Sequence, residues 1–187
     1  EKEKIIARQK ALTFAIDTLT KKRKKSSIAK RTYVRDVRRH LLKNGTHADK
    51  KFASILSLKE ISRWEAFYDS IIREKTPSEL RVAYLSGPNP ENDIDVFVKN
   101  GILPENIWAF ESDNKIYSTA IVSALKSRFP YVKIYKGKIE TYLKILPFKF
   151  DIIYLDFCST ISGEKTLSTV RDVFFHQKLE TLGILIT

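Results

Sequence analysis

Apolar side chains in the first 75 residues recur about every 3.6 positions, the period of one face of an α-helix. Ile5, Leu12, Ile16 and Leu19 follow this period and predict a first helix. A run of basic residues beginning at Lys21 ends the pattern. We expect the first helix to end where this run begins.

Three shorter helices are predicted after the basic run. Ser26 or Ser27 would cap the first of them, the pair Asn44-Gly45 would end it, and Thr46 would cap the next. The last helix ends before Pro77 and carries a stripe of large apolar side chains: Ile61, Trp64, Phe67, Tyr68, Ile71 and Ile72. Because a stripe at this spacing more often packs in a core than stacks on nucleic-acid bases, we expect it to be buried.

From Arg81 onward, short apolar runs alternate with amphipathic stretches. The runs predict strands at 81–86, 106–111, 132–135, 151–157 and 183–187. The stretches predict helices at 91–100, 113–129, 139–146 and 166–177. Strands that alternate with helices and are apolar on both faces imply a parallel sheet with right-handed crossovers. The predicted fold is therefore α/β, with a Rossmann-like parallel sheet of about five strands in residues 78–187 after a basic all-helical region in residues 1–77.

The positive charge of the chain is concentrated in its first part. The sequence holds 34 Lys+Arg and 22 Asp+Glu, a net charge of +12, and residues 1–80 contribute 21 of the basic and 10 of the acidic side chains. Such a concentration of charge favours a polyanionic partner. The candidate nucleic-acid-binding residues are Lys21, Lys22, Arg23, Lys24, Lys25, Arg31, Arg35, Arg38 and Arg39. A solvated helical face or an acidic protein partner are the other interpretations of this run.

The composition also excludes several classes of protein. Hydrophobic residues make up 43% of the chain, yet no apolar run reaches the roughly 20 residues of a membrane-spanning helix. Cys158 is the single cysteine, and His40, His47 and His176 are scattered, so neither a disulfide framework nor a metal site is predicted. We expect an intracellular, reducing, cytoplasmic setting and no membrane partner.

Polar residues stand where the predicted strands end, the edge at which open α/β sheets bind ligands. Glu111 ends the second strand, 24 residues beyond Gly87, which is a suitable place to accept the hydroxyl hydrogens of a ribose. Its other interpretation is a partner for the N-terminus of the next helix, a role that Asp113 could take instead. Asp156 ends the fourth strand as a candidate general base, although an acid there often only binds backbone amides. Cys158 is a weaker candidate nucleophile.

The order of these features resembles the class I S-adenosylmethionine-dependent methyltransferase fold. The matching segments are YLSGPNP (84–90), NIWAFES (106–112), YKGKIETYL (135–143) and FDIIYLDFCS (150–159). The resemblance implies S-adenosylmethionine as cofactor, with its methionine part beside the first strand end, its ribose on the second and its adenine beside the third. The residues implied are Ser86 and Gly87, Glu111, and Lys138 and Ile139, with Asp156 facing the substrate.

The chain departs from that family at several positions. Tyr84 stands where the first strand usually ends in an acid, and Gly87 is the only glycine of the loop. Lys138 replaces an acid that usually contacts adenine. The fourth strand ends in DFCS, which is neither the tetrad of amino-methylating enzymes nor a Pro-Cys nucleophile. The family's sheet also has two further strands, so we expect the sequence to be a segment of a longer chain.

The sequence therefore predicts a methyltransferase that acts on nucleic acid, with RNA slightly favoured over DNA because the DNA-type tetrad is absent. The alternative is a catalytically degenerate module that binds nucleic acid or assembles with partners. A nucleotide-dependent oxidoreductase is disfavoured because GxGxxG does not follow the first strand.

Overall fold

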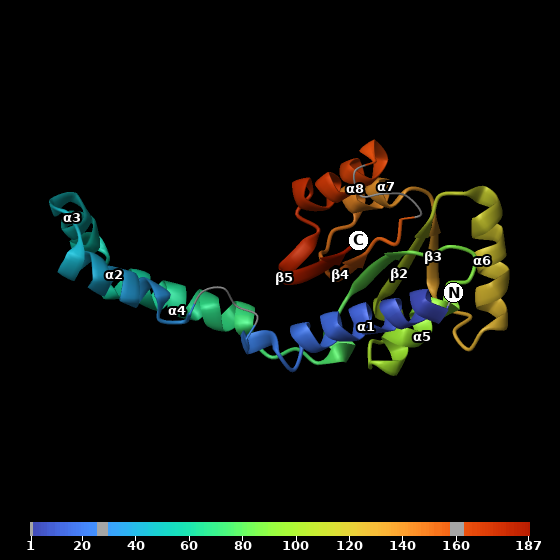
Figure 1. Ribbon diagram of the computed structural model, residues 1–187, viewed down its shortest axis with the longest axis horizontal. Coiled ribbons are helices and arrows are strands. Elements are labelled where there is room, and N and C mark those ends of the chain that lie inside the picture. Colours follow the sequence, from blue (N-terminus) through green and yellow to red (C-terminus); the bar gives the residue numbers. More distant parts are fainter. Residues whose placement is uncertain (1, 26–29, 158–162) are drawn as a thin grey trace. The chain divides into compact units, whose positions relative to one another are not determined.

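A five-stranded parallel sheet forms the centre of the computed structural model, which describes residues 2–25, 30–157 and 163–187. The strands lie in the order β3-β2-β1-β4-β5. Their bounds are β1 Val82–Leu85, β2 Ile107–Glu111, β3 Lys133–Lys136, β4 Phe150–Tyr154 and β5 Leu179–Ile186. The predicted α/β class and the parallel sheet of five strands are confirmed (Figure 1).

The last strand begins earlier than predicted. β5 starts at Leu179, and its register with β4 shifts between Phe150 and Ile152. Leu182 has a φ of 65°, a left-handed conformation that interrupts the pairing just before Gly183. The sequence pattern predicted only the part of the strand after this irregularity.

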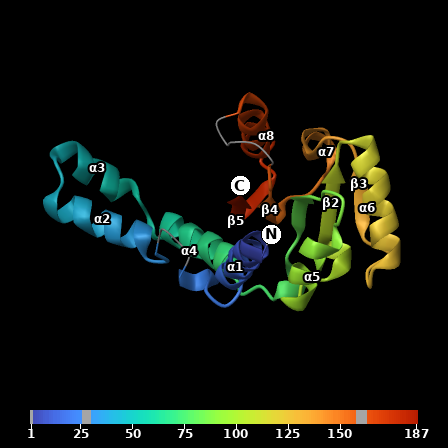
Figure 2. The same cartoon turned by 45° about the vertical axis from the view of Figure 1, so that its right-hand side comes forward.

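Helices cover both faces of the sheet (Figures 1 and 2). One core cluster packs the strands against α1 Lys2–Leu19 and α5 Glu91–Lys99. The other packs them against α7 Ile139–Ile145 and α8 Glu164–Phe175. Two crossovers thus run on each face, since α6 Asn114–Lys126 bonds to α5 through Ser123 Oγ and Glu91 Oε1 at 2.9 Å.

The chain divides into two compact units. The α/β unit comprises Glu1–Lys22 and Lys75–Thr187, and the helical unit comprises Arg23–Glu74. Short 3-10 helices, η1 Arg23–Lys25, η2 Pro77–Glu79 and η3 Pro104–Asn106, lie between the larger elements.

The first helix belongs to the α/β unit, whereas the sequence grouped it with the basic helices of residues 1–77. Leu12, Ala15, Ile16 and Leu19 are at most 2% exposed and lie in the core beneath the sheet. The division observed in the structure therefore differs from the expected boundary at residue 77. The basic run follows this helix directly, so no change in the sequence pattern predicted a boundary between the two units at Lys22.

The helical unit contains α2 Tyr33–Asn44, α3 His47–Ile55 and α4 Leu58–Ile72. Thr46 caps α3 as predicted, in a capping box with Asp49, and Ser57 and Glu60 form the same motif at α4. The expected caps Ser26 and Ser27 lie outside the described residues.

Little of the helical unit is buried. Its described buried residues are Arg23, Ala53, Ile61 and Ile72. The expectation that the aromatic stripe of α4 forms a core is wrong, because only the aliphatic ends of the stripe are buried and Phe67 is 54% exposed. A unit of this size can enclose few side chains, so it leaves large apolar groups in solvent.

Candidate functional site

The candidate site residues of the α/β unit follow neighbouring strands at one edge of the sheet. Ser86 N donates to Phe110 O at 3.0 Å, and Gly137 N donates to Glu111 O at 2.7 Å. Tyr84 pairs with Tyr154, so the segments after β1 and β4 also leave the sheet side by side. The strand order reverses direction between β1 and β4, which makes this edge the topological switch point of the sheet.

Gly87 lies beside open space. Its φ is +63°, a left-handed conformation that favours glycine, and a Cβ built there would meet no atom within 4 Å. Ser86 is 5% exposed and its Oγ donates to Gly87 O at 3.0 Å. The turn therefore needs a glycine for its backbone conformation, and its surroundings leave room for a ligand.

Glu111 and Asp113 divide the two roles that the sequence left open. Asp113 Oδ1 accepts from the backbone amides of Lys115 and Ile116 at 2.8 and 2.9 Å and so caps α6. These hydrogen bonds lower the pKa of Asp113. Glu111 Oε1 accepts from Asp113 N at 2.8 Å, while no protein partner is described for Glu111 Oε2. The helix is capped without Glu111, which leaves one of its oxygens for a ligand.

Lys138 and Ile139 take different positions after β3. Lys138 is exposed at the N-terminus of α7 and makes no side-chain cap. Ile139 is 3% exposed and packs in the core with Leu143 and Phe110. Of the two residues implied to border adenine, only Lys138 has its side chain in solvent.

Asp156 is joined by two residues that the sequence analysis did not select. Arg8 on α1 places Nε 2.8 Å from Asp93 Oδ1, without the alignment of a hydrogen bond, and Nη2 3.5 Å from Asp156 Oδ2. The side chain of Asp93 is 5% exposed and that of Asp156 is 54% exposed. Tyr154, the last residue of β4, lies near Arg8 and contributes to the raised pKa of its guanidinium group. One cation from the N-terminal helix thus reaches two carboxylates at the switch point.

Burial is the main influence on the pKa values of Arg8 and Asp93. Burial raises the pKa of Asp93 to about 7, with the nearby Asp156 acting in the same direction and Arg8 in the opposite one. Burial also opposes the charge of Arg8, but Asp93 and Tyr154 outweigh it and raise the pKa of Arg8. Asp93 is therefore a carboxyl group that changes protonation near neutral pH.

A weak signal for Arg8 was present in the sequence. Arg8 stands four residues before Leu12, on the same face of the helix as the buried stripe. Asp93 likewise stands beside the buried Ile94 in the first turn of α5. A charged residue in line with an apolar face indicates a buried partner, although sequence alone does not identify which partner.

Tyr84 replaces the acid that the resembled family usually has at the end of its first strand. It is fully buried, and its hydroxyl donates to Pro90 O at 3.2 Å. Burial raises the pKa of Tyr84 well above its usual value. Tyr84 therefore fastens the 87–90 turn as a neutral phenol and adds no charge to the site.

The basic candidates at 21–25 are largely engaged within the protein. Arg23 is 4% exposed and donates through Nε and Nη2 to Ile71 O at 3.2 and 2.8 Å. Lys21 Nζ lies 2.9 Å from Asp17 Oδ1, and Lys24 Nζ lies 2.6 Å from Glu74 Oε1. Lys22 and Lys25 are exposed.

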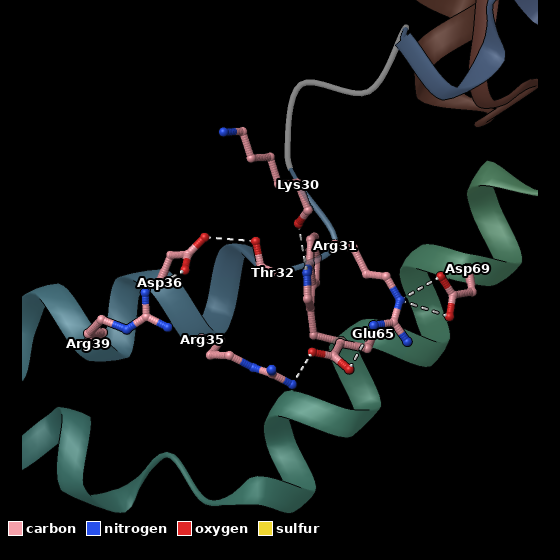
Figure 3. A network of polar contacts seen from close by, with 9 residues as sticks. Lys30, Arg31, Thr32, Arg35, Asp36, Arg39, Glu65 and Asp69 are labelled. Atoms are coloured by element: carbon pink, nitrogen blue, oxygen red, sulfur yellow. Dashed lines mark hydrogen bonds and ion pairs between the residues drawn. The ribbon is translucent and has the colours of Figure 1, made fainter.

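Arg31, just before α2, and Arg35 on α2 contact acids of α4, which lie 30 or more positions away in the sequence (Figure 3). Arg31 contacts Asp69 and Glu65 at 3.0 and 3.2 Å, and Arg35 contacts Glu65 at 2.7 Å. These pairs join segments far apart in the sequence, so the local charge pattern did not predict them.

Two further arginines of α2 are also engaged. Arg38 Nε donates to Leu56 O at 2.9 Å, and Arg39 pairs with Asp36 at 3.6 Å.

The lysines at the α3 end of the helical unit have no such partners among the described residues. Asp49 and Glu60, the nearest acids in sequence, accept from Thr46 and Ser57 in the capping boxes. Four exposed lysines lie on this part of the chain: Lys43, Lys50, Lys51 and Lys59.

A hollow of about 490 Å³ also lies in the helical unit. It is lined by Lys24, Tyr68, Asp69, Ile72, Arg73 and Glu74. It is separate from the strand-end residues, which all belong to the α/β unit.

Within the described ranges, no three or more His, Cys, Asp and Glu side chains gather as they would to hold a metal ion. No helix in the same ranges combines the length and the apolar character needed to cross a bilayer. Cys158, the weaker candidate nucleophile, lies outside the described residues. A search of protein-family models gives no match to this chain, and a search of curated proteins gives none either.

Proposed function

We propose that the α/β unit is an S-adenosylmethionine-dependent methyltransferase domain that acts on nucleic acid. The observation that carries the proposal is the row of Ser86-Gly87, Glu111 and Asp156 along neighbouring strand ends at the switch point of the sheet.

The residues present fit such a cofactor in part. Glu111 Oε2 would accept a hydrogen bond from a ribose hydroxyl, and the open space at Gly87 would allow a ligand to approach the backbone. When bound, the cofactor supplies a methyl group on a sulfonium for in-line displacement. The protein would contribute positioning, because displacement depends on the alignment of the two reactants.

Asp156 would bind or deprotonate the nucleophile of the substrate. Its side chain is 54% exposed, so a substrate can reach it, and Arg8 restrains its carboxylate from one side. We favour RNA over DNA because the segment after β4 lacks the tetrad of DNA amino-methylating enzymes.

Calorimetric titration with S-adenosylmethionine tests the proposal. We expect binding by the wild-type chain and a loss of about 1–3 kcal/mol of binding free energy in Glu111→Ala, as for lost hydrogen bonds. Glu105→Ala is the matched control, since Glu105 is exposed in the turn at the amino end of the same strand.

Wild-type affinity in Glu111→Ala would rule out the ribose assignment. An absence of binding by the wild-type chain up to millimolar cofactor would eliminate the enzyme. The chain would then be better described as a catalytically degenerate module, and the presence of only one glycine in the first loop would explain why it does not bind the cofactor.

A further inference from the structure

Four aromatic side chains gather on α2 and α4 of the helical unit. Trp64 lies at the centre of the group, with ring centroids 5.8 Å from Tyr33, 6.0 Å from Phe67 and 6.4 Å from Tyr68. We call these four side chains the aromatic platform. Its rings are mutually tilted and in contact, so they hold one another in place.

The platform is open to solvent. Tyr33 is 51% exposed and Phe67 is 54% exposed, and Trp64 and Tyr68 are partly exposed. A group of rings that served only as core would be covered by other elements of the unit. Here the described buried residues of the unit include none of the four rings. The platform is therefore an apolar surface available to a partner.

The charge around the platform indicates what kind of partner fits. The helical unit carries 14 Lys+Arg against six Asp+Glu, a net charge of +8. Trp64 Nε1 donates to the backbone oxygen of Lys30 at 3.3 Å, which holds the backbone of this exposed lysine beside Trp64. Two copies of so basic a surface would repel each other, whereas a polyanion would be attracted.

The ion pairs beside the platform do not prevent such an attraction. Arg31 and Arg35 are 52% and 51% exposed, and the contact of Arg31 with Asp69 lies at the surface, whereas Glu65 is only 13% exposed. Exposed ion pairs contribute little to stability, so Arg31 can exchange Asp69 for a phosphate at small cost. Arg35 contacts Glu65 through Nη2, and the exposed part of its guanidinium group can bind a phosphate while that contact is kept.

We propose that the aromatic platform binds the bases of single-stranded nucleic acid, with the phosphates on Lys30, Arg31 and Arg35. Exposed rings flanked by cations are the arrangement that binds unpaired bases with little sequence preference. Bases inside a duplex cannot reach the rings, so the strand must be single. The inference rests on the nucleic-acid partner of the proposed function and specifies that this partner is single-stranded.

Fluorescence anisotropy with labelled oligo(U) and oligo(dT) of about 15 nucleotides, a length within the usual site sizes, tests the inference. We expect Tyr33→Ala and Phe67→Ala each to weaken binding by roughly 5- to 100-fold, the range for loss of one stacked base. Phe52→Ala is the matched control, because Phe52 is 57% exposed in the same unit and belongs to no ring contact among the described residues. It should leave the affinity unchanged.

Two conservative variants separate stacking from packing. Phe67→Tyr keeps a π face and should retain wild-type affinity, whereas Phe67→Leu keeps apolar volume and should lose as much as Phe67→Ala. Duplex RNA of the same length should bind more weakly than the single strand and should be insensitive to all three changes at position 67.

Several outcomes would overturn the inference. One is a loss of affinity in Phe52→Ala as large as that in Phe67→Ala. Another is binding of the duplex as tight as binding of the single strand. A third is self-association of the wild-type chain, seen by analytical ultracentrifugation and abolished by Phe67→Ala while oligonucleotide binding stays intact, since the platform would then be an interface between copies. Cofactor titration is measured separately, so failure of the methyltransferase proposal leaves this result interpretable.

Discussion

Arg8 at the switch point is shared between two carboxylates that differ in their access to water. Asp93 is almost fully buried, while more than half of the Asp156 side chain is exposed. Burial penalises the ionised form of Asp93, and a single partly exposed guanidinium offsets only part of that penalty. The charge of Asp93 is therefore the property of this site that changes with pH near neutrality.

The pKa of Asp93 predicts a pH dependence of stability. Its folded value of about 7 lies above the value of 3.8 for the free group, so the native state keeps a proton that the unfolded chain releases as pH rises above about 4. The resulting contribution to the free energy of unfolding is fully present below pH 4 and is lost as pH rises through about 7. We expect the stability of Asp93→Asn relative to wild type to increase between pH 4 and pH 8, as measured by urea unfolding at each pH.

Asp95→Asn is the control for that measurement. Asp95 stands on the same helix but is 30% exposed, where it pairs with Lys99 and Arg128. A difference between Asp93→Asn and wild type that stays constant from pH 4 to pH 8 would contradict the raised pKa.

Single residues were predictable where their role is local. Thr46 was identified as a cap because a cap and its helix are neighbours in sequence, and Glu111 was placed at a strand end because the strand precedes it. The contacts of Arg8 and Arg31 were not predictable, because each joins elements that only the folded chain brings together. Local patterns determine position along an element, whereas partners depend on tertiary packing.

Among the elements, α1 differs most from what the sequence pattern predicted. Its period was read correctly, but its apolar face packs on the sheet more than 60 positions later in the chain rather than on the adjacent basic helices. The strands were easier to predict, because short apolar runs that alternate with helices indicate the buried strands of a parallel sheet. The sequence of an amphipathic helix indicates which face is buried, but it does not indicate which element that face packs against.

Substitutions on α1 test its place in the core. Ile16→Ala should lower the free energy of unfolding of the α/β unit by about 2–5 kcal/mol, since Ile16 is 2% exposed and its removal leaves a cavity. Ile6→Ala on the same helix should change it by less than about 0.5 kcal/mol, because Ile6 is 50% exposed. Chemical denaturation followed by circular dichroism measures both. Similar small effects of the two substitutions would show that α1 does not stabilise the sheet.

At the scale of the whole molecule, the helical unit carries +8 of the net charge of +12, but the basic side chains differ in how available they are to a partner. The arginines of α2 and two lysines of the 21–25 run already contact acids or carbonyl groups. Arg23 in particular is buried, so a variant that neutralises the entire run would disturb the fold as well as the charge. The lysines near α3 are additional candidates for phosphate contacts, because no acid pairs with them among the described residues.

The salt dependence of oligonucleotide binding should distinguish local phosphate contacts from net charge. Replacing Lys43, Lys50, Lys51 and Lys59 by Gln should reduce the slope of log K against log salt by about 0.7 for each lysine that contacts a phosphate of a single strand. The same change at four exposed lysines of the α/β unit removes equal charge: Lys4, Lys10, Lys126 and Lys144. That control should leave the slope almost unchanged, because counterions are released only where a cation lies against the strand. Equal slopes in the two variants would mean that the lysines near α3 contact no phosphate, and attraction would then come from the overall charge alone.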